Sequence, residues 1–235
     1  MTESRSGRGG GEPRGLVVDW GGVLTSALDE CMSAFCEADG IEYARFRAVM
    51  REWLGDAGAA SVAGNPAHAL ERGEVHARDF ERELATRLTT RDGRPVRAEG
   101  LLDRLFARFS ADDGMVGVVR RARAAGVRTA LCSNSWGNEY PTETWDGLFD
   151  AVVISGEVGM RKPERRIYLY TAEVLGLDPP ECVFVDDLAQ NVRGAVAAGM
   201  VGIHHTSAER TAEELEALFG IPLRPVTAAG AGGTA

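Results

Sequence analysis

The amino-acid sequence predicts an α/β fold in which a Rossmann-like, doubly wound parallel sheet carries an inserted all-helical segment. Short apolar runs rich in β-branched residues alternate with helical patterns along most of the chain, which is typical of parallel sheets. One long stretch, about 28–109, breaks this alternation, because it is rich in Ala, Arg, Glu and Leu and contains no convincing strand. A chain of 235 residues has room for one core of ordinary size and a smaller insert.

Several apolar runs are predicted to form the strands of the sheet. They are Leu16–Asp19, Val127–Cys132, Ala151–Ile154, Cys182–Asp186 and Val201–Ile203. The first four are apolar at successive positions rather than at alternate ones, so both faces of each strand are expected to be buried. We therefore expect helices above and below the sheet.

Helices are predicted between these strands from apolar spacing and from their end signals. Met115–Ala125 carries apolar residues at helical spacing, and Leu188–Ala198 repeats the pattern. Pro163 is predicted to open a third helix, because proline is tolerated in the first helical turn. A glycine follows the end of each helix, where it can adopt the left-handed conformation that closes many helices. These glycines are Gly126, Gly176 and Gly199.

The predicted organisation has a core in two pieces, residues 15–25 and 110–222, separated by a helical insert over 26–109. Within the insert, Phe80, Leu84 and Leu88 show helical periodicity, and Gly-Asn-Pro at 64–66 and Asp-Gly at 92–93 predict turns. Residues 1–14 and 223–235 are predicted to be a disordered N-terminal lead and a disordered tail, because their composition cannot support a core.

Charge and composition narrow the classes of partner. The net charge of −9 argues against a nucleic-acid surface, which needs clustered Lys and Arg. A small anion can still be held by one Lys, a metal ion and backbone N–H groups. No apolar stretch is long enough to span a membrane, and the N-terminus lacks the apolar region of a secretory signal. The four cysteines form no C-x-x-C pair, which favours a reducing, cytoplasmic location.

Two predicted strands end in carboxylates. Asp19 precedes a glycine-rich turn, in which Gly21 and Gly22 let backbone groups approach a ligand closely. Such an aspartate can attack phosphorus if a cation offsets the repulsion between two anions, or it can simply cap a turn. Asp186 and Asp187 end the fourth run. Adjacent carboxylates after an apolar strand suggest a hard cation with oxygen ligands, although one of the two could be a helix cap.

Two further segments carry polar groups at predicted element ends. Ser133 and Asn134 end the second strand, where a hydroxyl and an amide could bind phosphate oxygens or form a structural turn. Lys162 stands against a predicted helix start, fixed there by Pro163. A lone lysine is usually a solvated surface group, but one fixed beside a carboxylate would orient the nucleophile and offset charge on a phosphoryl group.

The order of these four segments resembles the four-motif sequence of the haloacid dehalogenase superfamily. The resemblance covers about Gly15 to Gly220, and the insert resembles the C1-type helical cap of subfamily I in that superfamily. The strings GMRKPERRIY and FVDDLAQNVRGAVAAGM are similar to one branch, and so is the cap segment that begins at Glu71. That branch contains glucose-1-phosphate phosphatases and the N-terminal phosphatase domain of soluble epoxide hydrolases.

The resemblance implies a Mg²⁺-dependent phosphatase that hydrolyses a small phosphorylated metabolite, such as a sugar phosphate, through an aspartyl-phosphate. Asp19 would be the nucleophile, and Lys162 would bridge it to the phosphoryl group. The implied phosphate-binding residues are Ser133, Asn134, Lys162 and Gly22. The implied metal ligands are Asp19, the backbone carbonyl of Gly21, Asp187 directly, and Asp186 nearby or through water. The first and fourth strands would lie side by side, with the site at their carboxyl ends. Such a protein would be a monomer or a homodimer.

Gly21 departs from the pattern of phosphatases in this superfamily, most of which carry a second aspartate two residues after the nucleophile. That aspartate protonates the leaving alcohol and then activates water, so its absence should cost on the order of 10²–10⁴ in rate for a poor leaving group. The first hypothesis is therefore a phosphatase in which water or a cap residue supplies the proton, with aryl or acyl phosphates favoured over alkyl ones. The cap candidates are His68, His76 and Glu71.

Two other hypotheses stay open. A 2-haloacid dehalogenase needs neither a metal nor a proton on its leaving halide, but those enzymes usually have an aromatic residue where Gly21 stands. A non-catalytic member of the superfamily would bind a phosphorylated ligand or a partner protein. The presence of all four motifs argues against this hypothesis. Substrate choice is expected in the cap, although charged residues on helices usually face water. The candidate contacts there are Arg45, Arg47, Arg51, Trp53 and Arg72.

Overall fold

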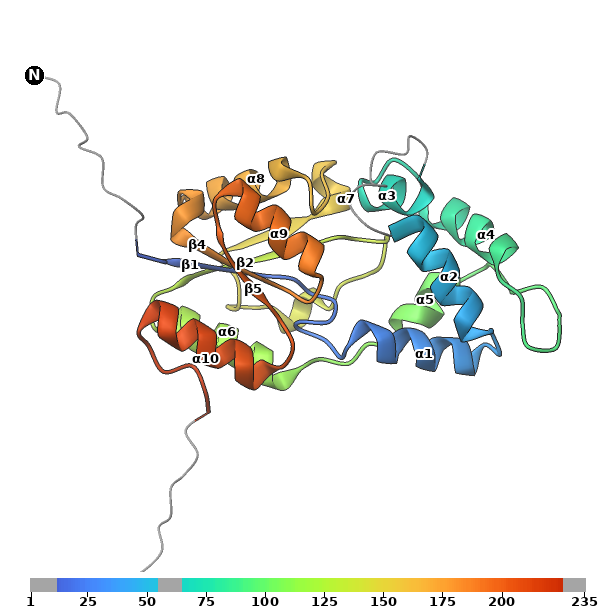
Figure 1. The fold of residues 1–235 in the computed structure, drawn as a ribbon, viewed down its shortest axis with the longest axis horizontal. Helices are drawn as coiled ribbons and strands as arrows, with labels where there is room; N and C mark the ends of the chain where they lie inside the picture. Colours follow the sequence, from blue (N-terminus) through green and yellow to red (C-terminus); the bar gives the residue numbers. More distant parts are fainter. Residues whose placement is uncertain (1–11, 55–64, 226–235) are drawn as a thin grey trace, which may run out of the picture.

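A parallel sheet forms the centre of the computed structural model, which describes residues 12–54 and 65–225. The sheet has five strands in the order β3-β2-β1-β4-β5 (Figure 1). They are β1 (Gly15–Val18), β2 (Arg128–Ser133), β3 (Ala151–Ile154), β4 (Cys182–Asp186) and β5 (Val201–His204). Each predicted run forms a strand, and β1 pairs with β4 in parallel. The predicted α/β sheet is therefore confirmed.

Helices cover both faces of the sheet, as the two-sided apolar strands predict (Figure 1). One face is covered by α6 (Asp113–Ala124) and α10 (Ala208–Phe219), and the other by α8 (Arg165–Leu175) and α9 (Ala189–Ala198). Successive residues of β1 point to opposite faces, so Leu16 and Val18 join one apolar cluster and Val17 joins the other. All three are fully buried, and the doubly covered sheet leaves its carboxyl edge as the place for polar side chains.

Helix ends follow the glycine signals, but one predicted start is wrong. The glycines at 126, 176 and 199 all have positive φ angles, as expected of residues that close helices. Pro163 does not open the third helix, because α8 begins at Arg165 with Glu164 as its N-cap. The side chain of Asn134 bonds to both the N–H and the carbonyl of Lys162, which ties this backbone to the loop after β2 instead of to a helical turn.

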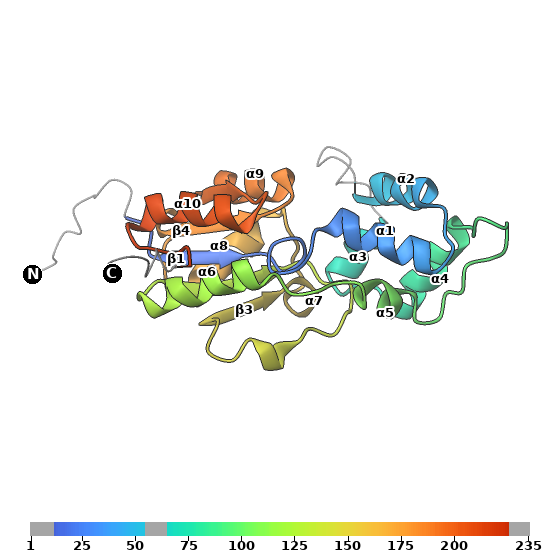
Figure 2. The ribbon, with the colours of Figure 1, turned by 90° about the horizontal axis from the view of Figure 1, so that it is seen from below.

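A separate helical layer lies beyond the carboxyl edge of the sheet (Figures 1 and 2). Its helices are α1 (Leu28–Ala38), α2 (Tyr43–Leu54), α3 (Pro66–Glu71), α4 (Ala77–Arg87) and α5 (Leu101–Phe106). This cap has its own apolar cluster, which includes Phe35, Phe46, Phe80, Leu84 and Leu105. Thr25 and Ala111 pair where the chain leaves and re-enters the core, so the two connections run side by side.

The ordered core extends beyond the predicted limits at both ends. The N–H of Arg14 donates to the carbonyl of Glu181 at 2.8 Å, although residue 14 was predicted to belong to the disordered lead. Leu223 was predicted to belong to the disordered tail, yet it is fully buried and its N–H donates to Glu216 at 2.7 Å. Residues 1–11 and 226–235 of the predicted lead and tail lie outside the described residues, as does Gly64 of the predicted turn.

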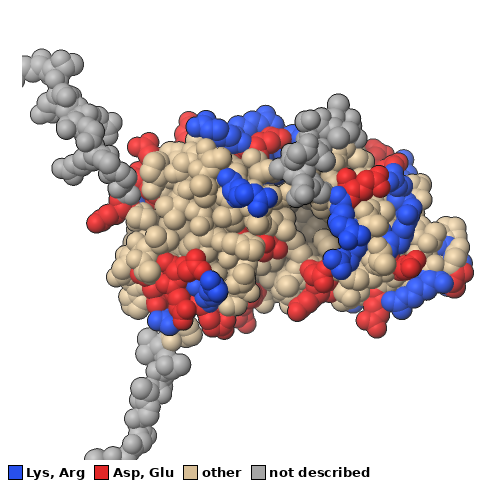
Figure 3. Space-filling view, in the orientation of Figure 1, with Lys and Arg blue, Asp and Glu red and all other residues tan. Residues whose placement is uncertain are grey.

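Charged side chains of both signs share the face of the molecule seen in Figure 3, with acidic groups gathered over α10 and basic groups on the cap. Within the described ranges, no helix combines the length and the apolar character that crossing a membrane requires. The four cysteines are buried and have no disulfide partner.

Candidate active site

A buried lysine joins the carboxylates at the ends of the two central strands. Since β1 and β4 are paired in parallel, Asp19 and Asp186 emerge at the same edge of the sheet. The Nζ atom of Lys162 lies 2.7 Å from Oδ1 of Asp19 and 2.7 Å from Oδ2 of Asp186, and its side chain is completely buried. Burial alone would lower the pKa of Lys162, but the two carboxylates outweigh it and raise that pKa well above its ordinary value. The lysine is therefore held in its charged form.

Asp186 is saturated with hydrogen bonds from the protein. Besides Lys162, it accepts from the N–H of Leu188 at 2.9 Å and from the amide of Asn191, which reaches both carboxylate oxygens at 3.0 and 3.1 Å. A carboxylate with donors on both oxygens is fixed in orientation. Asn191 was not identified from the sequence as a site residue, and its place here depends on the first turn of α9.

Asp187, in contrast, has an unsatisfied oxygen. Its Oδ1 atom is buried and has no hydrogen-bond partner among the described residues. Burial, reinforced by the neighbouring Asp186, raises the pKa of Asp187 to about 7. One carboxylate oxygen each from Asp19, Asp186 and Asp187 lies within 4.8 Å of the others. Within the described residues, Lys162 is the positive charge that contacts these three carboxylates, through Asp19 and Asp186. One positive charge does not balance three carboxylates. These features fit a hard divalent cation with oxygen ligands.

The glycine-rich turn after β1 makes room for this acidic pair. Gly22 adopts φ +73°, and a Cβ atom there would lie 2.5 Å from Oδ2 of Asp187. Its N–H, predicted to contribute to phosphate binding, donates to Oγ1 of Thr25 at 3.0 Å. Gly21, the predicted carbonyl ligand, lines the same pocket as Asp19. Burial also raises the pKa of Asp19, and the charge of Lys162 opposes that effect.

Ser133 and Asn134 reach the site from the end of β2, which is the other neighbour of β1. The hydroxyl of Ser133 lies 3.0 Å from the phenol oxygen of Tyr140, a residue that the sequence did not identify as a candidate. The amide of Asn134 is bonded to the backbone of Lys162, at 2.8 Å to its N–H and 3.1 Å to its carbonyl. Asn134 therefore holds the lysine loop in place, and its side-chain groups are already occupied.

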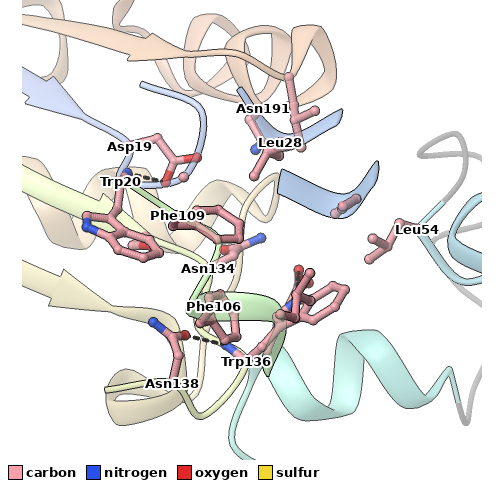
Figure 4. Close-up of a pocket in the computed structure, with 16 residues that line it drawn as sticks. Asp19, Trp20, Leu28, Leu54, Phe106, Phe109, Asn134, Trp136, Asn138 and Asn191 are labelled. Atoms are coloured by element: carbon pink, nitrogen blue, oxygen red, sulfur yellow. Dashed lines mark hydrogen bonds between the residues drawn. The ribbon is translucent and has the colours of Figure 1, made fainter. Parts of the chain in front are cut away.

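A pocket of about 110 Å³ opens beside Asp19, between the core and the cap (Figure 4). Much of its lining is a set of side chains that we call the apolar wall: Trp20, Leu28, Met32, Leu105, Phe106 and Phe109. The rings of Trp20 and Phe109 stack with centroids 5.5 Å apart. None of the charged cap residues that the sequence suggested as substrate contacts lines this pocket. Trp53 is buried in the cap core, and Arg72 forms ion pairs with Glu74 and Glu164.

A buried ion pair joins the cap to the core at the rim of this pocket. Glu71, at the end of α3, accepts from Arg161 through one oxygen and from the indole N–H of Trp136, at 3.2 Å, through the other. Glu71 lines the pocket, but both of its oxygens are thus engaged. His68 is buried within the cap and His76 is exposed, and neither lines the pocket. Glu71 is therefore the one predicted proton donor at the pocket.

Curated relatives match about half of the chain. A sesquiterpene phosphatase of Aspergillus oryzae is 33% identical over 46% of this chain and 58% of its own length. The chloroplast flavin mononucleotide hydrolase 1 of Arabidopsis thaliana is 30% identical over 59% of this chain and 57% of its own length. A match to a glyceraldehyde 3-phosphate phosphatase of Methanopyrus kandleri is 46% identical but covers 24% of each chain. The chain thus spans a little over half the length of the first and second of these relatives.

Solved structures show the same fold, and the sequence matches a family model along most of its length. A haloacid dehalogenase family enzyme from Bacteroides thetaiotaomicron, crystallised with magnesium, has a TM-score of 0.62 over 87% of this chain and 99% of its own, at 19% identity. A form of that enzyme with magnesium and inorganic phosphate has a TM-score of 0.59, over 83% of this chain and 94% of its own, at 20% identity. The model for haloacid dehalogenase-like hydrolases matches residues 13–199. The chain therefore belongs to the family of haloacid dehalogenase-like hydrolases.

Proposed function

We propose that this hydrolase is a Mg²⁺-dependent phosphatase that cleaves a small phosphorylated metabolite through an aspartyl-phosphate on Asp19. One observation carries the proposal: Asp19 is held 2.7 Å from the buried Lys162, beside an acidic pair with a buried oxygen that has no partner among the described residues. The proposed nucleophile Asp19, the ammonium group of Lys162 and the unsatisfied oxygen of Asp187 lie together at one edge of the sheet. The protein would act in the cytoplasm, as its free cysteines suggest, as a monomer or a homodimer.

The metal ligands we propose are Asp19, the carbonyl of Gly21, and Asp187, with Asp186 held back by its bonds to the protein. Asp187 is preferred over Asp186 as the direct ligand because its Oδ1 atom is unsatisfied. Bound Mg²⁺ would offset the negative charge of the phosphate and of the attacking carboxylate. Lys162 would share that task, since it already contacts the nucleophile.

The reaction would proceed in two displacements at phosphorus. In the first, an oxygen of Asp19 forms a bond to phosphorus while the bond to the leaving oxygen breaks, and the leaving group takes its proton from water. In the second, the oxygen of a water molecule bonds to the same phosphorus and the bond to Asp19 breaks. That water releases one proton to the solvent, which replaces the proton taken by the leaving group, and hydrogen phosphate departs. Lys162, the hydroxyl of Ser133 and the backbone N–H of Asn134 would hold the phosphoryl oxygens. The N–H of Gly22 is bonded to Thr25, so Gly22 would contribute by letting the turn approach the phosphate closely.

Names of the curated relatives support phosphate-ester hydrolysis and leave the carbon part of the substrate open. By their names, one is a sesquiterpene phosphatase, one hydrolyses flavin mononucleotide and one is a glyceraldehyde 3-phosphate phosphatase, and the carbon parts of these names have little in common. The reaction is therefore the better supported part of the proposal.

Phosphate release from a panel of phosphate esters tests the function, measured with Mg²⁺ and with EDTA. We expect turnover that needs Mg²⁺ and disappears in Asp19→Asn, with phosphate transfer to the wild-type protein detectable by intact mass as an aspartyl-phosphate. Chloride release from 2-chloropropionate in EDTA would instead identify a dehalogenase. Ligand binding without any turnover would identify a non-catalytic member, and either result would overturn the proposal.

A further inference from the structure

A side chain at position 21 would face apolar atoms. A Cβ atom on Gly21, where most phosphatases of this superfamily carry their acid, would lie 3.2 Å from Leu28 and 3.9 Å from Phe109. Both belong to the apolar wall. A leaving oxygen beside Asp19 therefore meets carbon on this side. The leaving group must depart with little help from a proton donor, which disfavours a strongly basic alkoxide (pKa of the alcohol roughly that of water, ~16) and favours a phenolate (~10).

Polar groups in the pocket lining are mostly committed to the protein. Ser133, Asn134 and Glu71 each bond to other residues of the chain. Among the lining atoms that the structure describes, Nδ2 of Asn138 and Oδ1 of Asn191 are the buried ones without a partner. A sugar brings several hydroxyl groups, more than these two atoms can satisfy, and each hydroxyl left without a partner is costly to remove from water.

The pocket has room for a small ring. Its volume of about 110 Å³ is of the same order as the ~150 Å³ apolar cavity that binds benzene in another protein. Trp20 and Phe109 present ring faces and edges at one side of it (Figure 4). Aromatic rings pack well against such side chains, in offset or edge-to-face contacts.

We propose, on the basis of the phosphatase function above, that the substrate is an aryl phosphate or a phosphate ester of similar shape. Its leaving group is one small apolar ring that packs on the apolar wall, and it is not a sugar. The apolar wall thereby affects substrate choice in two ways. It favours binding of an apolar leaving group, and it provides no proton donor for the leaving oxygen.

Three phosphate compounds separate the two effects in steady-state kinetics with Mg²⁺. Phenyl phosphate has the apolar ring and a good leaving group, acetyl phosphate has a good leaving group without the ring, and glucose 6-phosphate has neither. We expect kcat/KM for phenyl phosphate to exceed that for glucose 6-phosphate by at least 100-fold, and its KM to lie well below that of acetyl phosphate. Equal or greater activity on glucose 6-phosphate would overturn the inference.

Leu28→Asn tests the apolar wall directly, since Leu28 is half-buried on α1 and its replacement is not expected to disturb a core. We expect the ratio of kcat/KM for phenyl phosphate to that for acetyl phosphate to fall about 10-fold. Ser33→Asn, on an exposed position of the same helix, serves as the matched control and should leave the ratio unchanged. Circular dichroism checks that the Leu28→Asn protein is folded. An unchanged ratio in the folded variant would contradict the proposed contact between the aryl ring and the apolar wall.

Failure of the inference and failure of the phosphatase function give different results. Turnover of acetyl phosphate without a preference for phenyl phosphate removes the inference and leaves the function standing. No turnover of any of the three compounds, together with no difference between wild type and Asp19→Asn, removes both.

Discussion

A methyl group on Gly22 would collide with Asp187, because an ideal Cβ atom at position 22 lies 2.5 Å from Oδ2 of that carboxylate. The turn also requires φ +73° at this residue, which costs an L-amino acid about 1–2 kcal/mol. We expect Gly22→Ala to displace Asp187 from the acidic cluster and to raise the Mg²⁺ concentration for half-maximal activity by at least 10-fold. Titration of activity with Mg²⁺ measures the effect.

Gly40→Ala is the matched control for this substitution. Gly40 has φ +67°, yet a Cβ atom there would meet nothing within 4 Å. The two variants therefore share the backbone strain, and the collision is specific to position 22. A similar loss of Mg²⁺ response in both variants would show that strain, and not the displaced carboxylate, is responsible.

Asn191 is predicted to hold Asp186 in its orientation beside the proposed metal site and in its contact with Lys162. Asn191→Ala removes the amide that bonds both oxygens of Asp186. Loss of such an outer partner typically costs 10–100-fold in metal affinity or activity, and we expect a loss in that range. Gln190→Ala, one residue earlier in α9, should change neither quantity. Isothermal titration with Mg²⁺ and the pH–rate profile check the result, and an affinity equal to that of the wild type would contradict it.

The strands could be predicted because apolar runs mark them. The meeting of Asp19 and Asp186 was expected from the resemblance to a known family, which implied that the first and fourth strands are neighbours, since parallel strands bring their carboxyl ends to one edge. The start of α8 was predicted wrongly, because the hydrogen bonds of Asn134 to Lys162 join segments 28 residues apart. No periodicity in the sequence reports such a contact.

Residues that complete the site were missed for the same reason. Tyr140 reaches Ser133 from a loop with no regular structure, and Arg161 meets Glu71 across the boundary between core and cap. The charged cap residues proposed as substrate contacts were chosen by chemical type alone. The structure commits Arg72 to ion pairs, and the cap side chains that line the pocket are mostly apolar. Long-range packing decided these outcomes, and a single sequence does not encode it in a readable pattern.

The ion pair between Glu71 and Arg161 is predicted to fasten the cap to the core. Both side chains are at most 6% exposed, so removing one charge leaves the other buried without a partner. We expect Glu71→Gln to lower the free energy of unfolding by about 3–5 kcal/mol. The double variant Glu71→Gln/Arg161→Met should recover part of this loss, because no charge is then left unpaired. Denaturant unfolding measures both, and a double variant less stable than Glu71→Gln would refute the explanation.

Stability of the cap is predicted to fall in mild acid because of His68. Burial, with help from the charges of Arg161 and Arg72, lowers the pKa of His68 to about 4. In the unfolded chain the imidazole has a pKa of ~6.5, so the unfolded state binds more protons between these values. The contribution of this residue is therefore constant above pH 6.5, and stability is lost as the pH falls from 6.5 towards 4.

Melting temperatures at pH 7.5 and 5.0 test the role of His68. We expect the drop between these pH values to be smaller in His68→Gln than in the wild type. His76→Gln removes an exposed histidine from the same cap and should leave the drop unchanged. If both variants keep the full drop, the acid sensitivity belongs to other groups.

Gly21→Asp tests whether the missing acid sets the choice of leaving group. The new side chain would begin 3.2 Å from Leu28, a distance at which the leucine must move by a few tenths of an ångström, so Gly21→Asp/Leu28→Ala provides the extra room. A carboxylic acid near the leaving oxygen should recover at least 10-fold of the roughly 10²–10⁴ that general acid catalysis contributes for alkyl phosphates. Because phenolates need less help, the rate on aryl phosphates should change little. A plot of log kcat against leaving-group pKa should therefore become flatter, whereas an unchanged slope in a folded double variant would mean that another group already supplies the proton.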